Sequence, residues 1–245
     1  MRKKMKLYKK LNIDRLELIS LVGAGGKTST IYALAKELKR ENKKVLIAST
    51  TKMYYPNENF IDNLFLLDND IEYKNIPQGS ITVIGHKVKN KIGRVSSDYI
   101  NKLYKKDLFD VILVEADGAR KKPIKAPETY EPVIPSKSTK VIGILGLDSY
   151  KKNINSENVH RVDRFREITL SKSSQIIDET IIKKLVLNPK GLFKGVSESM
   201  EKYLLLNKID TIDLNIAKEV SEKIKNESKI KILITSMKNK VFIEV

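Results

Sequence analysis

The sequence predicts an α/β fold in which a mostly parallel sheet is flanked by helices. Apolar runs rich in β-branched residues alternate with stretches of helical period, which is typical of βαβ units. These runs are apolar almost throughout, as expected for strands covered on both faces. No run approaches the roughly 20 apolar residues that span a bilayer. We expect residues 1–245 to form a single domain with a small helical insertion at 149–200.

The first βαβ unit follows directly from the pattern near the N-terminus. A buried strand is expected at 17–23, a helix over 27–41 and a second strand over 43–50. Ile31 and Leu34 begin an apolar stripe at helical spacing, so one face of this helix should pack on the sheet. The helix therefore begins where a glycine-rich turn ends.

Further strands are expected along the rest of the chain. They are 63–68, 80–88, 109–117, 140–148, 202–209, 229–237 and 240–245. Residues 81–96 alternate around Asn90 and Gly93, which predicts a hairpin inserted as an antiparallel edge. Long polar loops at 118–136 and 148–170 each follow a strand, and ligands of α/β sheets bind beyond the carboxyl ends of strands.

Composition limits the classes of function. The net charge is 47 minus 30, or +17, which suits an anionic partner. The 39 lysines are spread evenly and do not interleave with aromatic residues, which argues against nucleic acid and for a solvated surface. With no Cys, and only His86 and His160 as imidazoles, zinc and iron–sulfur sites are not expected. The basic start lacks the apolar region of a signal peptide, so we expect a cytoplasmic protein without a membrane partner.

The stretch SLVGAGGKTSTIYALA predicts a phosphate-binding turn. A strand, a glycine turn and a helix N-terminus direct backbone N–H groups and the helix dipole at one point. Lys27 would reach the β- and γ-phosphates, and the Thr28 hydroxyl would bind Mg²⁺. The predicted nucleotide-binding residues are Gly23, Ala24, Gly25, Gly26, Lys27, Thr28 and Ser29. The full P-loop consensus needs a glycine at Leu21, so this is a compact variant of the P-loop, or a plain βα turn with Lys27 in solvent.

Two acids follow the strand that ends near residue 114. Glu115 could hold Mg²⁺ directly or through water, and Asp117 could orient an attacking water or sense the γ-phosphate. The alternative is an ordinary strand end with two solvated carboxylates. We assign catalytic roles to Lys27, Glu115 and Asp117, and metal binding to Thr28 and Glu115.

A third strand end, in LLLNKID, carries the guanine-reading pattern NKxD. The Asp210 carboxylate would accept from N1–H and the 2-amino group of guanine, which adenine cannot match. Asn207 would tie the loop and contact the base, and the stem of Lys208 would pack along it. Residues 235–236, after a helix expected at 213–226, resemble the next base-contacting loop of GTPases. The pattern favours GTP over ATP.

Other polar residues at strand ends have two interpretations each. Residues at the end of the second strand could bind Mg²⁺ or phosphate, or they could cap a helix. Residues after Asp117 could form a switch that closes on phosphate, or a solvated loop. A cluster of arginines could bind an anionic substrate, or form a charged helix face. The three groups are Thr50, Thr51 and Lys52; Arg120, Lys121 and Lys125; and His160, Arg161, Arg164 and Arg166.

Taken together, VGAGGKTS, ASTTKM, VEADGARKKPIKAPETYEPVIP, VHRVDRF, PKGLFKG and LLNKID resemble the YqeC family, described as accessory proteins of selenium-dependent molybdenum hydroxylases. The resemblance extends over nearly the whole chain, and its most specific part is the EADGAR to EPVIP block. It implies a P-loop NTPase-like fold and a role in maturing those hydroxylases, with a molybdenum hydroxylase or its cofactor as partner.

The sequence therefore predicts a Mg²⁺-dependent, GTP-preferring NTPase that acts as an accessory protein. Two alternatives stay open. One is an ATP-dependent transferase or ligase acting on a cofactor precursor, because the spacing GxxGKT also occurs in Mur-type peptide ligases. The other is a nonenzymatic cofactor chaperone, whose partner binding would ignore nucleotide.

Overall fold

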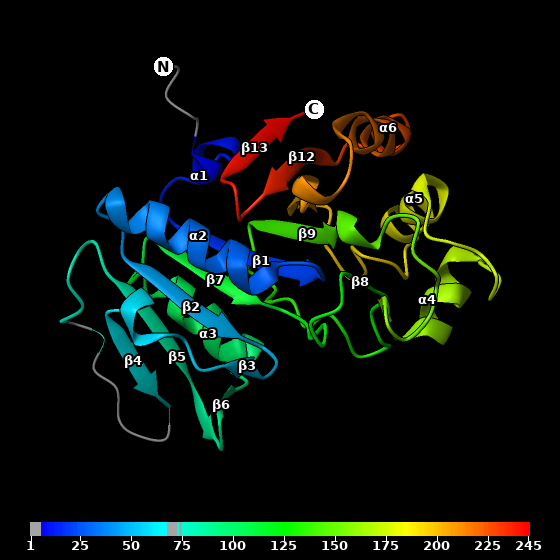
Figure 1. Ribbon diagram of the computed structural model, residues 1–245. Helices are drawn as coiled ribbons and strands as arrows, with labels where there is room; N and C mark the ends of the chain where they lie inside the picture. Colours follow the sequence, from blue (N-terminus) through cyan, green and yellow to red (C-terminus); the bar gives the residue numbers. More distant parts are fainter. Residues whose placement is uncertain (1–5, 68–72, 74) are drawn as a thin grey trace. The chain divides into compact units, whose positions relative to one another are not determined.

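The computed structural model describes residues 6–67, 73 and 75–245 (Figure 1). The chain divides into two compact units. Unit 1 comprises residues up to Leu21, Thr28–Ala116 and Val133–Lys140, and unit 2 comprises Val22–Lys27, Asp117–Pro132 and Val141–Val245. The glycine turn thus belongs to unit 2, and the helix after it continues in unit 1. The expectation of one domain over 1–245 stays a prediction.

Unit 1 contains a set of neighbouring parallel strands. Its elements are α1 (Leu7–Lys10), β1 (Glu17–Gly23, whose last two residues belong to unit 2), α2 (Lys27–Arg40), β2 (Val45–Ser49), β3 (Met53–Tyr54), η1 (Glu58–Phe60), β4 (Asn63–Leu66), β5 (Ile81–Val88), β6 (Lys91–Gly93), α3 (Ser97–Lys105) and β7 (Val111–Glu115). Strand β7 lies between β1 and β2, and β2 is followed by β5, with all of these pairs parallel. Strand β4 also pairs with β5 in parallel.

The inserted hairpin is confirmed. Strands β5 and β6 pair antiparallel, with His86 opposite Gly93. Strand β3 adds to the outer side of β6, also antiparallel, so the edge of this sheet is β3. A two-residue strand such as β3 is too short to show an alternating pattern in the sequence.

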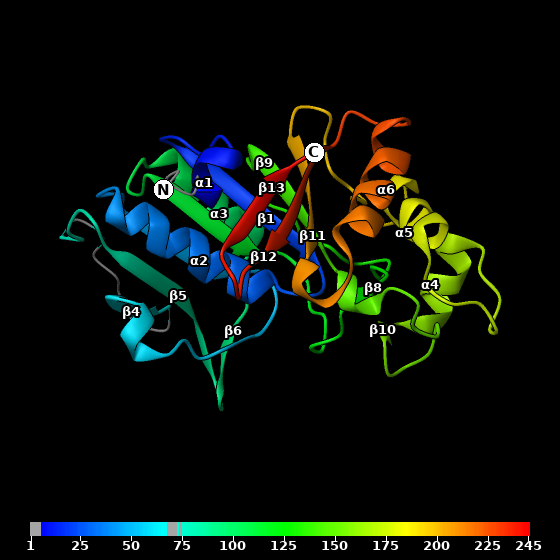
Figure 2. The same cartoon turned by 45° about the horizontal axis from the view of Figure 1, so that its top comes forward.

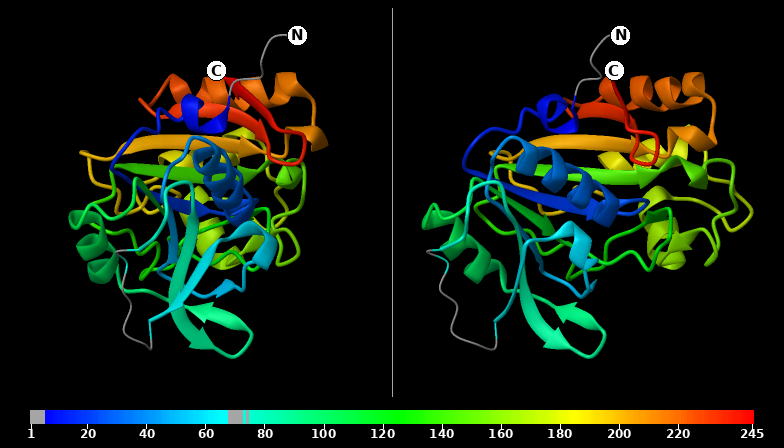
Figure 3. Two further views of the ribbon diagram at one scale, coloured as in Figure 1. Left: turned by 90° about the vertical axis from the view of Figure 1, so that its left-hand side faces the viewer. Right: turned by 60° about the vertical axis from the view of Figure 1, so that its left-hand side comes forward.

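Helices cover both faces of the unit 1 sheet. Alternate residues of the strands, such as Leu18, Leu46 and Ile112, form one core cluster with Ile100 and Leu103 of α3. Successive strand residues point to opposite faces, and α2 lies on the face opposite α3 (Figures 1 and 3). The apolar stripe of α2 is buried there, as the spacing of its residues predicted. The α/β fold with helices flanking a mostly parallel sheet is therefore confirmed.

Unit 2 combines six strands with a set of helices. Its elements are β8 (Ile124–Lys125), β9 (Lys140–Gly146), η2 (Leu147–Ser149), β10 (Val159–His160), α4 (Val162–Thr169), α5 (Glu179–Leu187), β11 (Glu201–Asn207), η3 (Ile209–Thr211), α6 (Leu214–Lys225), β12 (Lys231–Ser236) and β13 (Val241–Glu244). The strand order is β13, β12, β11, β9, with β11 and β12 parallel and β12 and β13 antiparallel. Helix α5 lies between α4 and α6 (Figure 2).

The sequence missed several short elements of the chain. Helix α3 begins after Ser96, whose hydroxyl accepts from the N–H of Tyr99 as an N-cap. The short pair β8 and β10 also escaped prediction, as did α1. Helices α4 and α5 lie in the segment 149–200, where helical structure was expected. In the part of the chain that the structure describes, none of the helices has the length and apolar character needed to cross a membrane.

Candidate functional site

The glycine turn of unit 2 takes a backbone that only glycine adopts readily. Gly23, Gly25 and Gly26 have φ of 91°, 78° and 138°. A Cβ on Gly25 would lie 2.2 Å from the backbone nitrogen of Gly146, and one on Gly26 would lie 2.3 Å from Nδ2 of Asn207. The turn is therefore fitted closely between the strand ends of unit 2, and its glycines are a structural requirement.

Lys27 folds back over this turn. Its side chain is buried, with 3% exposed, and Nζ donates to the carbonyl oxygen of Gly23. Nζ also lies 3.0 Å from Oδ1 of Asp117. The expectation of Lys27 in solvent, which belongs to the plain-turn interpretation, is therefore wrong. The ammonium group contacts a carbonyl oxygen and a carboxylate.

Asp117 connects the turn to the long loop after β7. Its Oδ2 accepts from the N–H of Gly23 at 3.0 Å and lies 3.0 Å from Nζ of Lys125. The carboxylate is only 2% exposed, so it is not one of a pair of solvated acids. It is placed to control the position of Lys27. Its predicted action on water or the γ-phosphate stays a prediction.

The ion-pair row continues beyond Lys125. Nζ of Lys125 lies 2.6 Å from Oε2 of Glu131, and the guanidinium of Arg161 binds both oxygens of Glu131. Burial alone would raise the pKa of Glu131, but its hydrogen bonds and ion pairs with Arg161 and Lys125 outweigh burial and lower that pKa to about 2. Glu131 was not singled out in the sequence, although it lies in the EADGAR to EPVIP block.

His160 lies in β10, opposite Lys125 of β8. Burial lowers the pKa of His160 to about 4, helped by the positive charges of Arg161, Lys125 and Arg120. The imidazole is therefore neutral at physiological pH. A neutral imidazole beside this row adds no charge to it.

The pKa shifts of His160 and Glu131 predict that the fold becomes less stable in acid. His160 binds a proton near pH 6.5 when unfolded but only near 4 when folded, so unfolding is favoured as pH falls from 6.5 to 4. Glu131 stabilises the fold above pH 4.5, and that contribution is lost as pH falls toward 2. Between pH 6.5 and 4 the free energy of unfolding falls, and His160→Gln should make that fall smaller by roughly 1 to 2 kcal/mol. This is less than the whole pKa shift of His160 corresponds to, because the ring is partly exposed to solvent. Urea unfolding at a series of pH values measures the free energy of unfolding. If it falls equally steeply with pH in the variant and the wild type, the prediction is wrong.

Unit 1 holds the predicted metal ligands. Oγ1 of Thr28 donates to Oε2 of Glu115 at 3.1 Å, and the hydroxyl of Ser49 donates to the Glu115 carbonyl. Thr28 and Ser29 are exposed on the first turn of α2, and Glu115 is buried. Hydroxyl and carboxylate oxygens suit Mg²⁺, which usually keeps several waters and takes one or two protein carboxylates. Within the described residues, no group of three or more His, Cys, Asp or Glu side chains is arranged for a metal.

Asn207 joins the guanine-type motif to the glycine turn within unit 2. Its Nδ2 donates to the carbonyl oxygen of Gly25 at 2.8 Å, and its Oδ1 accepts from Oγ1 of Thr235 at 3.1 Å. The side chain is buried. Asn207 thus ties the glycine turn in place, whereas the sequence predicted only that it ties its loop. Its contact with a base stays a prediction.

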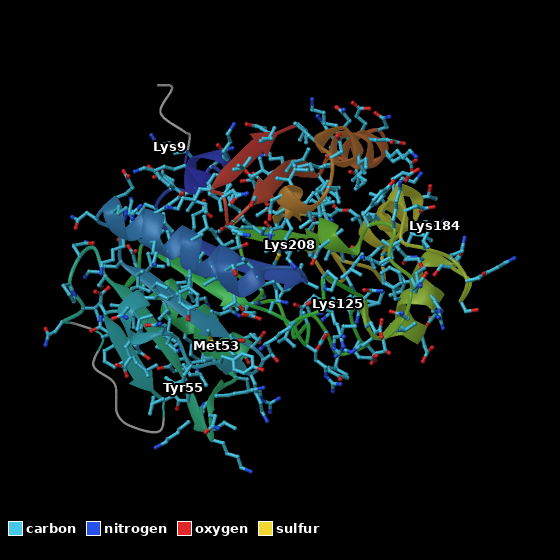
Figure 4. All side chains as sticks on the ribbon, in the orientation of Figure 1. Lys9, Met53, Tyr55, Lys125, Lys184 and Lys208 are labelled. Carbon is cyan, nitrogen blue, oxygen red and sulfur yellow. The ribbon has the colours of Figure 1, made fainter. Side chains whose placement is uncertain are left out.

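Asp210 and Lys208 project differently from the same strand end. Asp210 is exposed, and its Oδ1 accepts from the hydroxyl of Ser236. That hydrogen bond lowers the pKa of Asp210, so its carboxylate is ionised and able to accept. Lys208 forms a 2.6 Å ion pair with Asp148, which lies in η2 directly after β9 (Figure 4 labels Lys208). The predicted packing of the Lys208 stem along a base stays a prediction.

The remaining candidates do not converge on one point. Thr50 donates to the Val133 carbonyl and caps no helix. Arg120 and Lys121 are exposed in left-handed backbone. Of the arginine cluster, Arg164 pairs with Glu167, and Arg166 donates to the carbonyl of Ile154, whereas Arg161 turns inward to Glu131. Lys125 is fully buried, so the solvated-loop interpretation is wrong for it.

The fold and the turn define a class of protein. It is a mostly parallel α/β protein in which the first strand leads through a glycine turn into a helix. A family model described as YqeC protein matches residues 19–163. A protein of Escherichia coli K12, described as an uncharacterized protein YqeC, is 34% identical over 210 residues, which cover 83% of this chain and 80% of that protein. The chain belongs to the YqeC family. The match to the family model includes the glycine turn and Asp117 but ends before Asn207.

Proposed function

We propose that this protein binds a magnesium nucleotide, with GTP preferred, and hydrolyses it. The phosphates bind the glycine turn, where Lys27 exchanges the Asp117 carboxylate for a phosphate oxygen. The buried position of Lys27 beside three glycines with positive φ supports this role. Asp210 accepts from the guanine edge, and Asn207 holds the turn.

One observation carries the proposal. The amide of Asn207 binds the carbonyl of Gly25 directly, although the two residues are 182 positions apart in the chain. A phosphate-binding turn and a base-reading motif must be held at a fixed separation to bind one nucleotide. The hydrogen bond supplies such a link, and it lies entirely within unit 2.

Mg²⁺ is the ion that Thr28 and Glu115 would hold, since both present oxygen ligands. When bound with the nucleotide, the ion would neutralise charge on the phosphates. Thr28 follows Lys27 directly in the chain, and Glu115 precedes Asp117 by two residues. These short connections keep the metal ligands close in sequence to the residues that bind phosphate.

The metal assignment predicts a specific loss in a threonine variant. Thr28→Val keeps the shape of the side chain and removes its oxygen, so GTP affinity with Mg²⁺ should fall about tenfold, equivalent to one lost charge-assisted contact. With EDTA, variant and wild type should bind alike. Calorimetric titration under both conditions measures the difference. An equal loss with and without Mg²⁺ would show that Thr28 does not bind the ion.

We also propose that nucleotide use serves an accessory role in maturing selenium-dependent molybdenum hydroxylases. Support for this role comes from membership of the YqeC family and from the resemblance described above. Incubation of the purified protein with GTP or ATP and a candidate apo-hydroxylase, followed by assay of hydroxylase activity, tests it. Activation that needs no nucleotide would favour a chaperone, and a phosphorylated or adenylylated product would favour a transferase.

A further inference from the structure

Unit 2 contains a row of alternating buried charges that starts at the glycine turn. In order, the row consists of Lys27, Asp117, Lys125, Glu131 and Arg161. It holds three cations and two carboxylates, and each carboxylate contacts two cations. Its middle members are the least exposed, at 2% for Asp117 and 1% for Lys125 (Figure 4 labels Lys125).

The ammonium group of Lys125 lies among three oxygen acceptors, two in hydrogen bonds and the third in an ion pair. Nζ lies 3.0 Å from Oδ2 of Asp117, 2.6 Å from Oε2 of Glu131 and 2.7 Å from the carbonyl oxygen of Gly118. An ammonium group has three donors and no acceptor. Lys125 is therefore surrounded by acceptors and fully buried, which keeps it from reaching a phosphate in the turn.

Lys27 is the member of the row that lies in the glycine turn, and its departure would remove one of the two cations that contact Asp117. A buried carboxylate that loses its cation is strongly unfavourable, because desolvation of the charge is no longer offset. Asp117 would keep Lys125 and the N–H of Gly23 as partners after Lys27 moved. Lys27 can thus leave without stranding a charge.

We propose that Lys125 is a positioning residue that neutralises Asp117 and so frees Lys27 to bind phosphate. The inference rests on the proposed function, since it concerns the same phosphate site. Lys125 touches neither substrate nor metal and acts through Asp117. Without Lys125, Asp117 would hold Lys27 as its remaining side-chain cation, and phosphate would have to compete against that stronger attachment.

A double-mutant cycle on GTP affinity tests this role. Lys125→Met should weaken Mg²⁺·GTP binding about tenfold to thirtyfold in the wild-type background. In the Asp117→Asn background the same substitution should change affinity less than threefold, because no carboxylate remains to hold Lys27. Lys125→Gln, which keeps N–H donors without the charge, replaces Lys125→Met if that variant does not fold, with the same expected values.

A matched control separates positioning from stability. Lys140 is another buried lysine, paired with Glu17 at the start of β1 in unit 1. Lys140→Met should lower the melting temperature and leave GTP affinity unchanged. A tenfold loss of GTP affinity from Lys125→Met in both Asp117 backgrounds, or no loss in either, would overturn the positioning role of Lys125. The proposed function would stand in that case, because the wild type would still bind GTP. Absence of GTP binding by the wild type would overturn both.

Discussion

Lys27→Met is expected to reduce GTP affinity by about 100-fold. The ammonium group would make charge-assisted hydrogen bonds to phosphate, each worth roughly 1.5 to 3 kcal/mol, and methionine offers none. The fold should persist, because Asp117 keeps Lys125 and the N–H of Gly23. Calorimetry with GTP and Mg²⁺ measures the affinity, and circular dichroism checks the fold.

Arg40→Met provides the control for Lys27. Arg40 is exposed at the last position of α2, so this variant loses the same unit of charge from the same helix. Its GTP affinity should match the wild type. If both variants bind GTP as the wild type does, Lys27 has no part in phosphate binding, and the glycine turn serves only to connect β1 and α2.

Asp210→Asn should reverse the preference among bases. Guanine presents two N–H donors, which a carboxylate can both accept. The amide of asparagine has only one acceptor, so its NH₂ group would face a donor of guanine. GTP affinity should therefore fall about 100-fold. Xanthine carries an oxygen in place of the 2-amino group and can accept from the amide, so XTP should bind the variant better than GTP. Competition of both nucleotides against a fluorescent GTP analogue gives the ratio.

Asp213→Asn is the matched control for Asp210. Asp213 is exposed three residues further along, and its side chain caps α6 by accepting from the N–H of Asn215, which asparagine also does well. This variant should keep the wild-type order of nucleotides. An Asp210→Asn protein that still prefers GTP over XTP would show that another group reads the base.

The strands and the glycine turn could be predicted because their causes are local. Apolar β-branched runs favour buried strands, and the three glycines before Lys27 mark a turn that only glycine adopts easily. The hairpin of β5 and β6 was also predicted from its local alternation. Pairs such as β8 and β10, two residues each, contain no period to detect.

The contacts of the charged residues could not be predicted, because they depend on distant segments. Lys125 appeared as one lysine in a basic loop, and only the path of the chain brings it between Asp117 and Glu131. The arginine cluster likewise separates, since Arg161 alone turns toward Glu131. Asn207 was expected to tie its loop, but the motif did not name Gly25 as the partner that the structure shows. A sequence motif predicts such a hydrogen bond or ion pair only where it specifies both residues that take part.

The central claim is that this chain binds a magnesium guanine nucleotide through the glycine turn and the Asn207–Asp210 segment. Calorimetric titration of the wild-type chain with GTP and with ATP, each in Mg²⁺ and in EDTA, tests it most directly. We expect one GTP bound per chain, more tightly than ATP and more weakly in EDTA. Absence of binding by both nucleotides in Mg²⁺ would contradict the account.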